Sequence, residues 1–208
     1  MRLILVRHGQ SEGNVSGVVQ GRVDFALSPL GEEQARATGA RLADVAVERV
    51  VSSPLLRAYQ TAAAIAVPHS LEVVRDHGLA EYDIGDVSGM TGPEIRERFP
   101  HVIEAYRRGE RPGYPGEEGR DAFQARILAT IDGLRDLPGT SVAVAHGGVI
   151  SLLCSLAVGL DQRFRPGVFQ VANCSLTELT TDRQGRLTIE RHNDTCHLRG
   201  LVTRIDRG

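Results

Sequence analysis

The chain has 208 residues, and this length predicts one domain over residues 1–208. A hydrophobic content of 41% and a formal net charge of −2 are typical of a globular protein and argue against a general nucleic-acid binder, which carries a basic surplus. All 24 basic residues are arginine. The chain therefore cannot use a Schiff-base lysine or a Walker A lysine, and anion binding falls to arginine.

The first third of the chain alternates strand and helix signals. The predicted strands are Leu3–Val6, Arg49–Ser52 and Leu71–Val74. Ser28-Pro29 predicts the start of a helix that runs to about Val45, because serine is a favoured N-cap and proline suits the first helical position. Ser53-Pro54 repeats this pattern and predicts a second helix to about Ala66.

The stretch from residue 83 to residue 119 has a different composition. Glycine and proline punctuate it throughout, which leaves room for two short helices near Pro93–Phe99 and His101–Arg108. We interpret this stretch, at about 83–119, as a small helical insertion or lid over one end of a sheet.

Regular patterning returns after the insertion. The apolar residues of the next helix fall on one face and are Phe123, Ile127, Ile131 and Leu134. A strand over Ser141–Ala145, a helix over Val149–Val158 and closing strands over Cys174–Thr181 and Arg186–His192 follow. Strands that alternate with helices favour an α/β fold, a three-layer α/β/α arrangement around a mainly parallel sheet.

Cationic and titratable side chains lie where predicted strands end. Arg7 and His8 directly follow the first strand, Arg57 lies in the first helical turn after the second, and His146 ends a later strand. Parallel strands bring their carboxyl ends to one edge of a sheet, so these four residues should converge on one crevice. A cluster this basic, in a chain of net charge −2, predicts an anionic ligand.

Phosphoryl transfer suits these residue types. Neighbouring positive charges should lower the pKa of at least one imidazole, and a neutral His8 is a competent nucleophile. Glu81, just after the third predicted strand, is the best candidate proton donor for a leaving alkoxide. Ser11 and Asn14 add polar groups after His8, and Gly147 begins a helix whose backbone N–H groups can approach a phosphate.

Four short blocks of the sequence combine the candidate site residues with glycines and small polar residues. They are Leu5–Ser11 with Asn14 and Gln20-Gly21, Ser52–Ala62, Glu81 with Gly85 and Gly89, and Val144–Gly148. Together they resemble the motifs of the histidine phosphatase superfamily, also called phosphoglycerate mutase-like, and they span nearly the whole chain. Two positions depart from that pattern. Ser11 stands where threonine is common and keeps the hydroxyl, and no tryptophan lies near Gly89.

The resemblance implies a phosphoglycerate mutase-like fold and a reaction that uses no metal and no other cofactor. His8 is then the nucleophile that forms a phosphohistidine, and Glu81 is the proton donor. Arg7, Arg57 and His146 form the phosphate pocket. The residues that the resemblance implies in binding the phosphate or the leaving group are Ser11, Asn14, Gln20, Gly21 and Gly147.

Three functions are compatible with these residues. A phosphomonoesterase passes the phosphoryl group to water, whereas a phosphoglycerate mutase passes it to a second hydroxyl. The short stretch between Glu81 and His146 and the end Asn193–Leu198 resemble the phosphatase branch, so we expect a phosphatase. The third function is a catalytically silent phospho-ligand binding module. The intact residues that argue against it are His8, Arg57, Glu81 and His146.

The surroundings of the protein can be predicted only coarsely. Three sparse cysteines without metal-type spacing suggest a reducing compartment, and we expect a cytoplasmic protein. The expected partner is a small phosphomonoester, with no nucleic acid. No membrane is expected either, because no stretch approaches the length of a span. A homodimer stays open, and no residue names the leaving group of the substrate.

Overall fold

One six-stranded sheet runs through the described part of the chain, which in this computed structural model comprises residues 1–160, 168–182 and 184–203. The strand order is β3-β2-β4-β1-β5-β6. The strands are β1 (Arg2–Arg7), β2 (Val47–Ser52), β3 (Val73–Arg75), β4 (Thr140–Ala145), β5 (Leu176–Thr181) and β6 (Leu187–Asp194). β1 to β4 pair in parallel, whereas β5 and β6 are antiparallel. The sheet is therefore mixed but mostly parallel.

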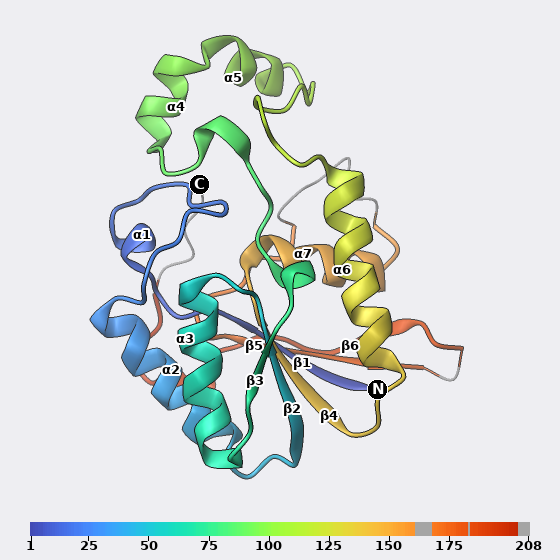
Figure 1. Cartoon of the computed structure of the whole chain (residues 1–208). Helices are drawn as coiled ribbons and strands as arrows, with labels where there is room; N and C mark the ends of the chain where they lie inside the picture. Colours follow the sequence, from blue (N-terminus) through green and yellow to red (C-terminus); the bar gives the residue numbers. More distant parts are fainter. Residues whose placement is uncertain (161–167, 183, 204–208) are drawn as a thin grey trace.

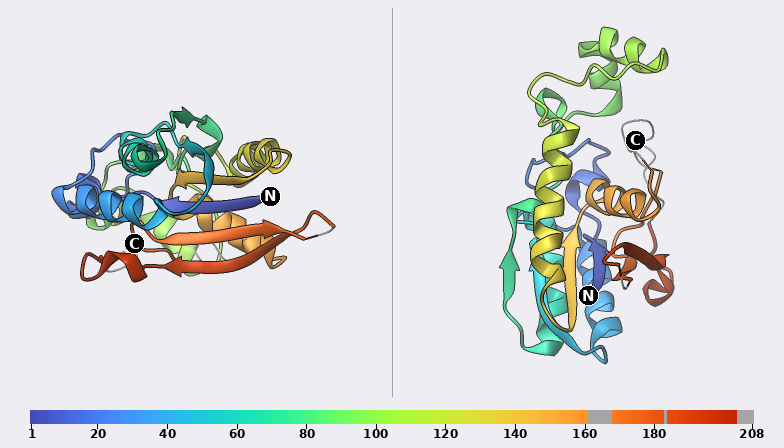
Figure 2. Two further views of the ribbon diagram at one scale, coloured as in Figure 1. Left: turned by 90° about the horizontal axis from the view of Figure 1, so that it is seen from below. Right: turned by 90° about the vertical axis from the view of Figure 1, so that its right-hand side faces the viewer.

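Helices cover both faces of this sheet (Figures 1 and 2). α2 (Pro29–Leu42) and α3 (Leu56–Ala66) lie on one side of the strands, and α6 (Arg120–Arg135) and α7 (Gly147–Ala157) lie on the other. The shorter helices are α1 (Glu12–Val15), α4 (Gly92–Arg98), α5 (Pro100–Arg107), η1 (Val67–His69), η2 (His77–Leu79), η3 (Gly85–Val87) and η4 (Cys196–Leu198). The predicted three-layer α/β/α fold is confirmed.

The core follows the alternation of side chains along β1. Leu3 and Leu5 join the apolar cluster that α6 and α7 build, whereas Ile4 and Val6 join the cluster of α2 and α3. All four are at most 3% exposed, as expected for a central strand buried on both faces. The predicted apolar face of α6 is also confirmed, because all four of its residues are buried.

Most element boundaries differ from the sequence-based expectation by one to three residues, and the start of α3 and the position of β3 are two examples. Ser28 caps α2 as predicted, since its side chain accepts a hydrogen bond from the Gly31 N–H. Ser53 does not cap α3 in this way. That helix begins at Leu56, and its N-cap residue makes no side-chain capping bond. β3 also lies further along the chain than predicted, at Val73–Arg75.

The segment of residues 84–117 carries α4 and α5 and projects beyond the carboxyl ends of the parallel strands (Figure 1). Its ends meet, because Ile84 and Glu117 form a β-bridge and the Glu118 N–H donates to the Asp83 carbonyl at 3.1 Å. It also has its own apolar cluster, which includes Val87, Ile95, Phe99 and Val102.

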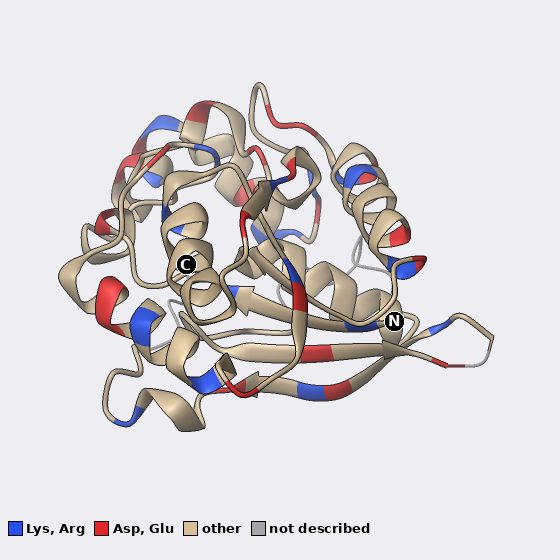
Figure 3. Cartoon of the chain, turned by 60° about the horizontal axis from the view of Figure 1, so that its bottom comes forward, with Lys and Arg blue, Asp and Glu red and all other residues tan. Residues whose placement is uncertain are grey.

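Charged residues of both signs are spread over the molecule (Figure 3). Basic residues, all of them arginine, and acidic residues are interspersed along the helices, strands and loops of the ribbon (Figure 3). Within the residues that the structure describes, every helix is too short or too polar to cross a bilayer.

Candidate active site

The predicted cluster of site residues lies where three parallel strands end. His8 follows β1, Ser53 follows β2 and His146 follows β4. The backbone pairing continues one residue past the strands, because the His8 N–H donates to the Ala145 carbonyl at 3.0 Å. The imidazole rings of His8 and His146 consequently lie side by side, with 5.1 Å between their centroids.

The His8 ring is buried, with 3% of the residue exposed. Its Nδ1 lies 2.7 Å from the carbonyl oxygen of Gly9. A carbonyl can only accept, so Nδ1 carries the proton of the neutral ring and Nε2 holds the lone pair. Burial, followed by the positive charges of Arg57 and Arg7, lowers the pKa of His8 well below 6.5. The ring is therefore uncharged and nucleophilic at Nε2 at neutral pH.

Gly9 is needed beside this ring for packing reasons. A Cβ on Gly9 would come 2.6 Å from the carbonyl oxygen of Gly31, at the start of α2. The Gly9 N–H also donates to Thr61 Oγ1 of α3 at 3.0 Å. The glycine therefore allows two helices to approach the loop that holds His8.

His146 is fully buried beside His8. Its Nε2 lies 2.7 Å from Ser53 Oγ, while its Nδ1 has no hydrogen-bond partner among the described residues. Burial, and after it the neighbouring His8, Arg57 and Arg7, lowers the pKa of His146. A buried ring nitrogen without a partner is costly unless a ligand provides one.

Arg57 lies in the first turn of α3 and is 1% exposed. Its guanidinium donates to the carbonyls of Val23 at 2.9 Å and Gly21 at 2.8 Å, and its buried Nε has no partner among the described residues. Gly21 can present its carbonyl there because its φ of +50° lies in the left-handed region. Burial lowers the pKa of Arg57 to about 10, so the side chain stays charged at neutral pH.

Arg7 and Gly147 bring further positive potential to this edge. Arg7 at the end of β1 donates to the Val171 carbonyl at 2.7 Å. Gly147 is the first residue of α7, and a Cβ on it would lie 4.0 Å from Arg7 Nε. The N-terminus of α7 and the Arg7 guanidinium therefore lie close together, which favours an anion.

The Glu81 carboxyl group lies against the same helix N-terminus. Its Oε2 accepts from the Gly148 N–H at 3.2 Å and its Oε1 accepts from the Tyr82 N–H at 2.8 Å. A Cβ on Gly148 would collide with Oε1, so this contact needs glycine at that position. The negative charge of Glu81 also acts on Arg57, which places the carboxyl group near the arginine and histidine cluster.

The other predicted binding residues form a bonded loop next to His8. Ser11 caps α1, and its Oγ lies 2.8 Å from Gln20 Oε1 and 3.0 Å from Asn14 Oδ1, so the two amide oxygens share its one hydroxyl proton. These bonds engage the amide oxygens of Asn14 and Gln20. Any contact of these two side chains with a ligand would therefore come from their amide nitrogens.

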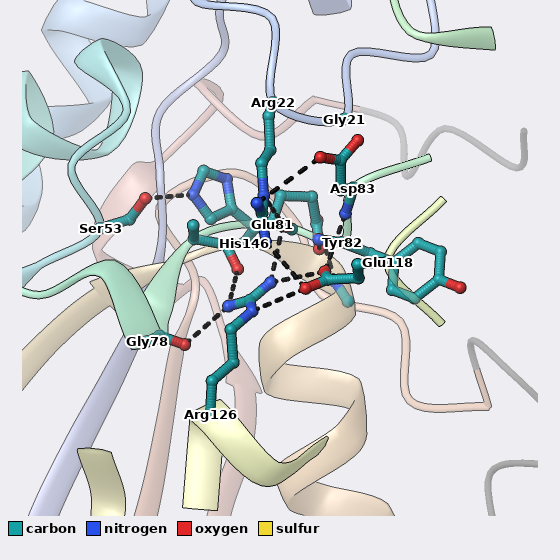
Figure 4. A network of polar contacts seen from close by, with 12 residues as sticks. Gly21, Arg22, Ser53, Gly78, Glu81, Tyr82, Asp83, Glu118, Arg126 and His146 are labelled. Atoms are coloured by element: carbon teal, nitrogen blue, oxygen red, sulfur yellow. Dashed lines mark hydrogen bonds and ion pairs between the residues drawn. The ribbon is translucent and has the colours of Figure 1, made fainter. Parts of the chain in front are cut away.

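Several residues of the site were not predicted from the sequence. Ser53 faces His146, although the pattern Ser53-Pro54 suggested a helix cap instead. Asn173 donates from Nδ2 to the His8 carbonyl at 3.0 Å and lies 3.5 Å from Asn14 Oδ1. Arg126 of α6 binds the backbone at Glu81 (Figure 4). In a chain with 24 arginines, no local signal separates Arg126 from the solvated ones.

Comparison with known proteins identifies the family. The family model described as histidine phosphatase superfamily (branch 1) matches residues 3–195. The chain is 33% identical to phosphoserine phosphatase 1 of Hydrogenobacter thermophilus, covering 95% of this chain and 94% of that protein. It is 30% identical to a probable phosphoglycerate mutase of Yersinia enterocolitica, covering 95% of each.

A solved structure agrees with these sequence matches. The fold superposes on a mycobacterial glucosyl-3-phosphoglycerate phosphatase, determined as a complex with VO3, with a TM-score of 0.82 and 32% identity. That comparison covers 93% of this chain and 99% of the other. The chain therefore belongs to the histidine phosphatase superfamily, branch 1.

Proposed function

We propose that this phosphomonoester hydrolase carries its phosphohistidine on His8 and uses Glu81 as proton donor. His8 Nε2 attacks phosphorus, the phosphorus–oxygen bond to the leaving group breaks, and the departing oxygen takes the proton of the Glu81 carboxyl group. Arg7, Arg57 and His146 stabilise the charge on the equatorial oxygens of the transferring group.

The second half of the reaction returns the enzyme to its starting state. A water molecule attacks the phosphorus of the phosphohistidine, the phosphorus–nitrogen bond breaks, and the Glu81 carboxylate takes one proton from that water. Orthophosphate leaves, and His8 again holds a lone pair on Nε2. All atoms and charges balance without a further reactant.

The environment of the His8 ring is the observation that carries this proposal. The bond from Nδ1 to the Gly9 carbonyl fixes the tautomer, and burial beside two arginines keeps the ring neutral. Arg57 Nε and His146 Nδ1 add two buried nitrogens that lack partners among the described residues. A phosphoryl group would satisfy both nitrogens next to the nucleophile.

The remaining predicted residues have supporting parts in the proposal. The amide nitrogens of Asn14 and Gln20 and the N–H of Gly147 donate to the phosphate or the leaving group. Ser11 fixes the two amides by its hydrogen bonds, and Gly21 holds Arg57 through its carbonyl. The insertion predicted at about 83–119 is the proposed lid, since its 84–117 segment lies beyond the strand ends (Figure 1). In this proposal the lid contacts the leaving group.

The proposal predicts that His8→Ala abolishes hydrolysis of a generic phosphomonoester. Wild-type enzyme mixed rapidly with ³²P-labelled substrate should yield an acid-labile, alkali-stable phosphoenzyme that is absent in His8→Ala. Activity should persist in a chelator, because side chains of this chain supply both nucleophile and charge stabilisation. His69→Ala, on η1 and outside the site, is the matched control and should behave as wild type.

Activity retained in His8→Ala would contradict the assignment of the nucleophile. Activity abolished by the chelator would contradict the metal-independent mechanism. Binding of phosphate with neither a phosphoenzyme nor turnover would instead indicate a phospho-ligand binding module.

Transfer to a second hydroxyl is the alternative that the Yersinia relative supports, because that protein is named as a probable phosphoglycerate mutase. Both reactions share the first half, and the acceptor decides between them. Assays of 3-phosphoglycerate with and without a bisphosphorylated primer distinguish the two. We expect release of orthophosphate that does not depend on the primer.

The substrate is proposed to be a small phosphorylated metabolite. The named relatives act on phosphoserine and glucosyl-3-phosphoglycerate, and these two compounds should head a panel ranked by kcat/KM. A steep preference for one of them would name the class of leaving group.

We further propose a cytoplasmic enzyme. Its three cysteines are free, and burial raises the pKa of Cys154 and of Cys174 to about 12, which keeps both thiols unreactive. Sedimentation analysis decides between a monomer and the homodimer that the sequence left open.

A further inference from the structure

Arg126 of α6 uses all of its guanidinium donors around Glu81 (Figure 4). Its Nη1 donates to the carbonyls of Gly78 at 2.8 Å and Ala80 at 2.7 Å. Its Nη2 donates to the Glu81 carbonyl at 2.9 Å and to Glu118 Oε1 at 2.8 Å, and its Nε donates to Glu118 Oε2 at 3.0 Å. One side chain therefore binds three carbonyls of the short backbone stretch, residues 78–81, that carries the proposed proton donor.

Glu118 completes this arrangement from the other side. Its Oε1 also accepts from the Asp83 N–H at 2.9 Å, and its Oε2 accepts from Arg22 Nη2 at 2.8 Å. The Glu118 side chain is only 12% exposed, and hydrogen bonds satisfy both of its carboxylate oxygens. Although burial opposes it, bonding to Arg126 and to the Asp83 N–H lowers the pKa of Glu118 and keeps it ionised.

Arg22 links this network to the phosphate pocket. Its Nε lies 3.3 Å from the Glu81 carbonyl, so that oxygen accepts from two arginines. Arg22 also lies between Gly21 and Val23, whose carbonyls hold the Arg57 guanidinium. The loop that positions Arg57 and the backbone that positions Glu81 are therefore bonded to each other through Glu118.

We propose that Arg126, Glu118 and Arg22 are positioning residues for the general acid. They hold the backbone at Glu81 so that its carboxyl group meets the Gly148 N–H at a fixed distance from the phosphate pocket. None of the three touches the phosphoryl group in this role. The inference rests on the proposed function of Glu81 as proton donor.

Leaving-group dependence separates such a role from general support of the fold. An alkyl phosphate expels a strongly basic alkoxide and needs the proton from Glu81, whereas 2,4-dinitrophenyl phosphate expels a weak base and does not. The two probes share the same phosphoryl group and nucleophile. Damage to the phosphate pocket slows both, but displacement of the acid slows the alkyl phosphate selectively.

The experiment measures kcat/KM for β-glycerol phosphate and 2,4-dinitrophenyl phosphate in Arg126→Lys, Glu118→Gln and Arg22→Gln. Lysine keeps the charge of Arg126 but offers three donors where the guanidinium offers five. We expect each variant to lose about 10- to 100-fold on the alkyl phosphate and less than about 2-fold on the aryl phosphate. Arg22 is 39% exposed, so its variant tests the network at little risk to folding.

Glu81→Ala and a double variant complete the design. Glu81→Ala should also lose kcat/KM mainly on the alkyl phosphate, and by a larger factor than the network variants. The double variant Glu81→Ala/Arg126→Lys should have the same kcat/KM on the alkyl phosphate as Glu81→Ala alone. Arg135→Lys, in a partly exposed ion pair with Asp132 on the same helix, is the matched control and should behave as wild type.

Two results would overturn the inference in distinguishable ways. Equal losses on both probes in the network variants, with Glu81→Ala still selective, would show that the network supports the fold only. Equal losses of kcat/KM on both probes in Glu81→Ala would show that Glu81 is not the general acid. That result would overturn both the proposed function of Glu81 and the positioning role of the network.

Discussion

At the scale of single residues, burial determines the protonation state of the proposed nucleophile. Burial, then Arg57 and Arg7, lowers the His8 pKa below 6.5. We therefore predict that the His8 imidazole stays neutral as pH falls through 6.5 and titrates only at a lower value. ¹⁵N NMR of histidine-labelled protein, with the signal assigned by its loss in His8→Asn, measures this pKa directly.

Arg57→Gln provides the internal comparison for that titration. Removal of one positive charge should raise the His8 pKa, yet leave it below 6.5 because burial remains the larger cause. A wild-type value at or above 6.5 would contradict the proposed neutral nucleophile.

The sequence was sufficient to place residues at strand ends, but it did not predict the hydrogen bonds between their side chains. Arg7, His8, Arg57 and His146 could be brought to one edge because apolar runs end directly before or near them. Asn173 and Arg126 reach the site from distant parts of the chain through side-chain contacts. Such contacts depend on tertiary packing, and nothing in the local sequence around either residue specifies them.

At the scale of elements, the first turn of α7 must accommodate the proposed acid. A Cβ on Gly148 would collide with Glu81 Oε1, which is the mobile end of a side chain. We predict that Gly148→Ala displaces the carboxyl group and lowers kcat/KM for β-glycerol phosphate about 10- to 100-fold, with little change for 2,4-dinitrophenyl phosphate. Thermal unfolding should be unchanged or occur at higher temperature, because alanine is the better helix former.

Gly133→Ala in α6 is the matched control for this change. A Cβ there meets nothing within 4 Å, so the variant should keep full activity on both substrates. A Gly148→Ala enzyme with normal turnover of the alkyl phosphate would show that the contact with the Glu81 carboxyl group is dispensable.

Element boundaries also mark the limit of local patterns. Ser28-Pro29 and Ser53-Pro54 look alike in sequence, but only Ser28 caps its helix. Ser53 lies at the end of β2 in the sheet, next to the strand that delivers His146, and its hydroxyl is engaged there. The order of strands in the sheet, which no local pattern encodes, determines whether the serine of a Ser-Pro pair caps a helix or contacts a neighbouring strand end.

At the scale of the whole molecule, the two buried imidazoles couple stability to pH. The pKa values of His8 and His146 are lowered in the folded state. Below pH 6.5, the ordinary pKa of histidine, the unfolded chain therefore binds more protons than the folded protein. The free energy of unfolding should be highest above pH 6.5 and fall as pH drops toward the folded pKa values. Each group contributes up to about 1.4 kcal/mol per pH unit within that window.

Denaturant titrations between pH 5 and pH 7.5 measure this slope. The double variant His8→Asn/His146→Gln lacks both titrating groups and should show a flatter dependence. An unchanged slope in that variant would assign the acid sensitivity to other titrating groups, such as His192 and His197, whose pKa values burial also lowers.

The meeting of the two ends of the 84–117 segment has a consequence for how such enzymes diversify. Ile84 pairs with Glu117, and Asp83 bonds to Glu118, so the chain leaves the sheet framework and returns to it at one point. A piece inserted in this way can be exchanged for one of another length or shape while the strand ends stay in register. Substrate preference can then change by substitution of this segment, while the residues at the strand ends stay the same.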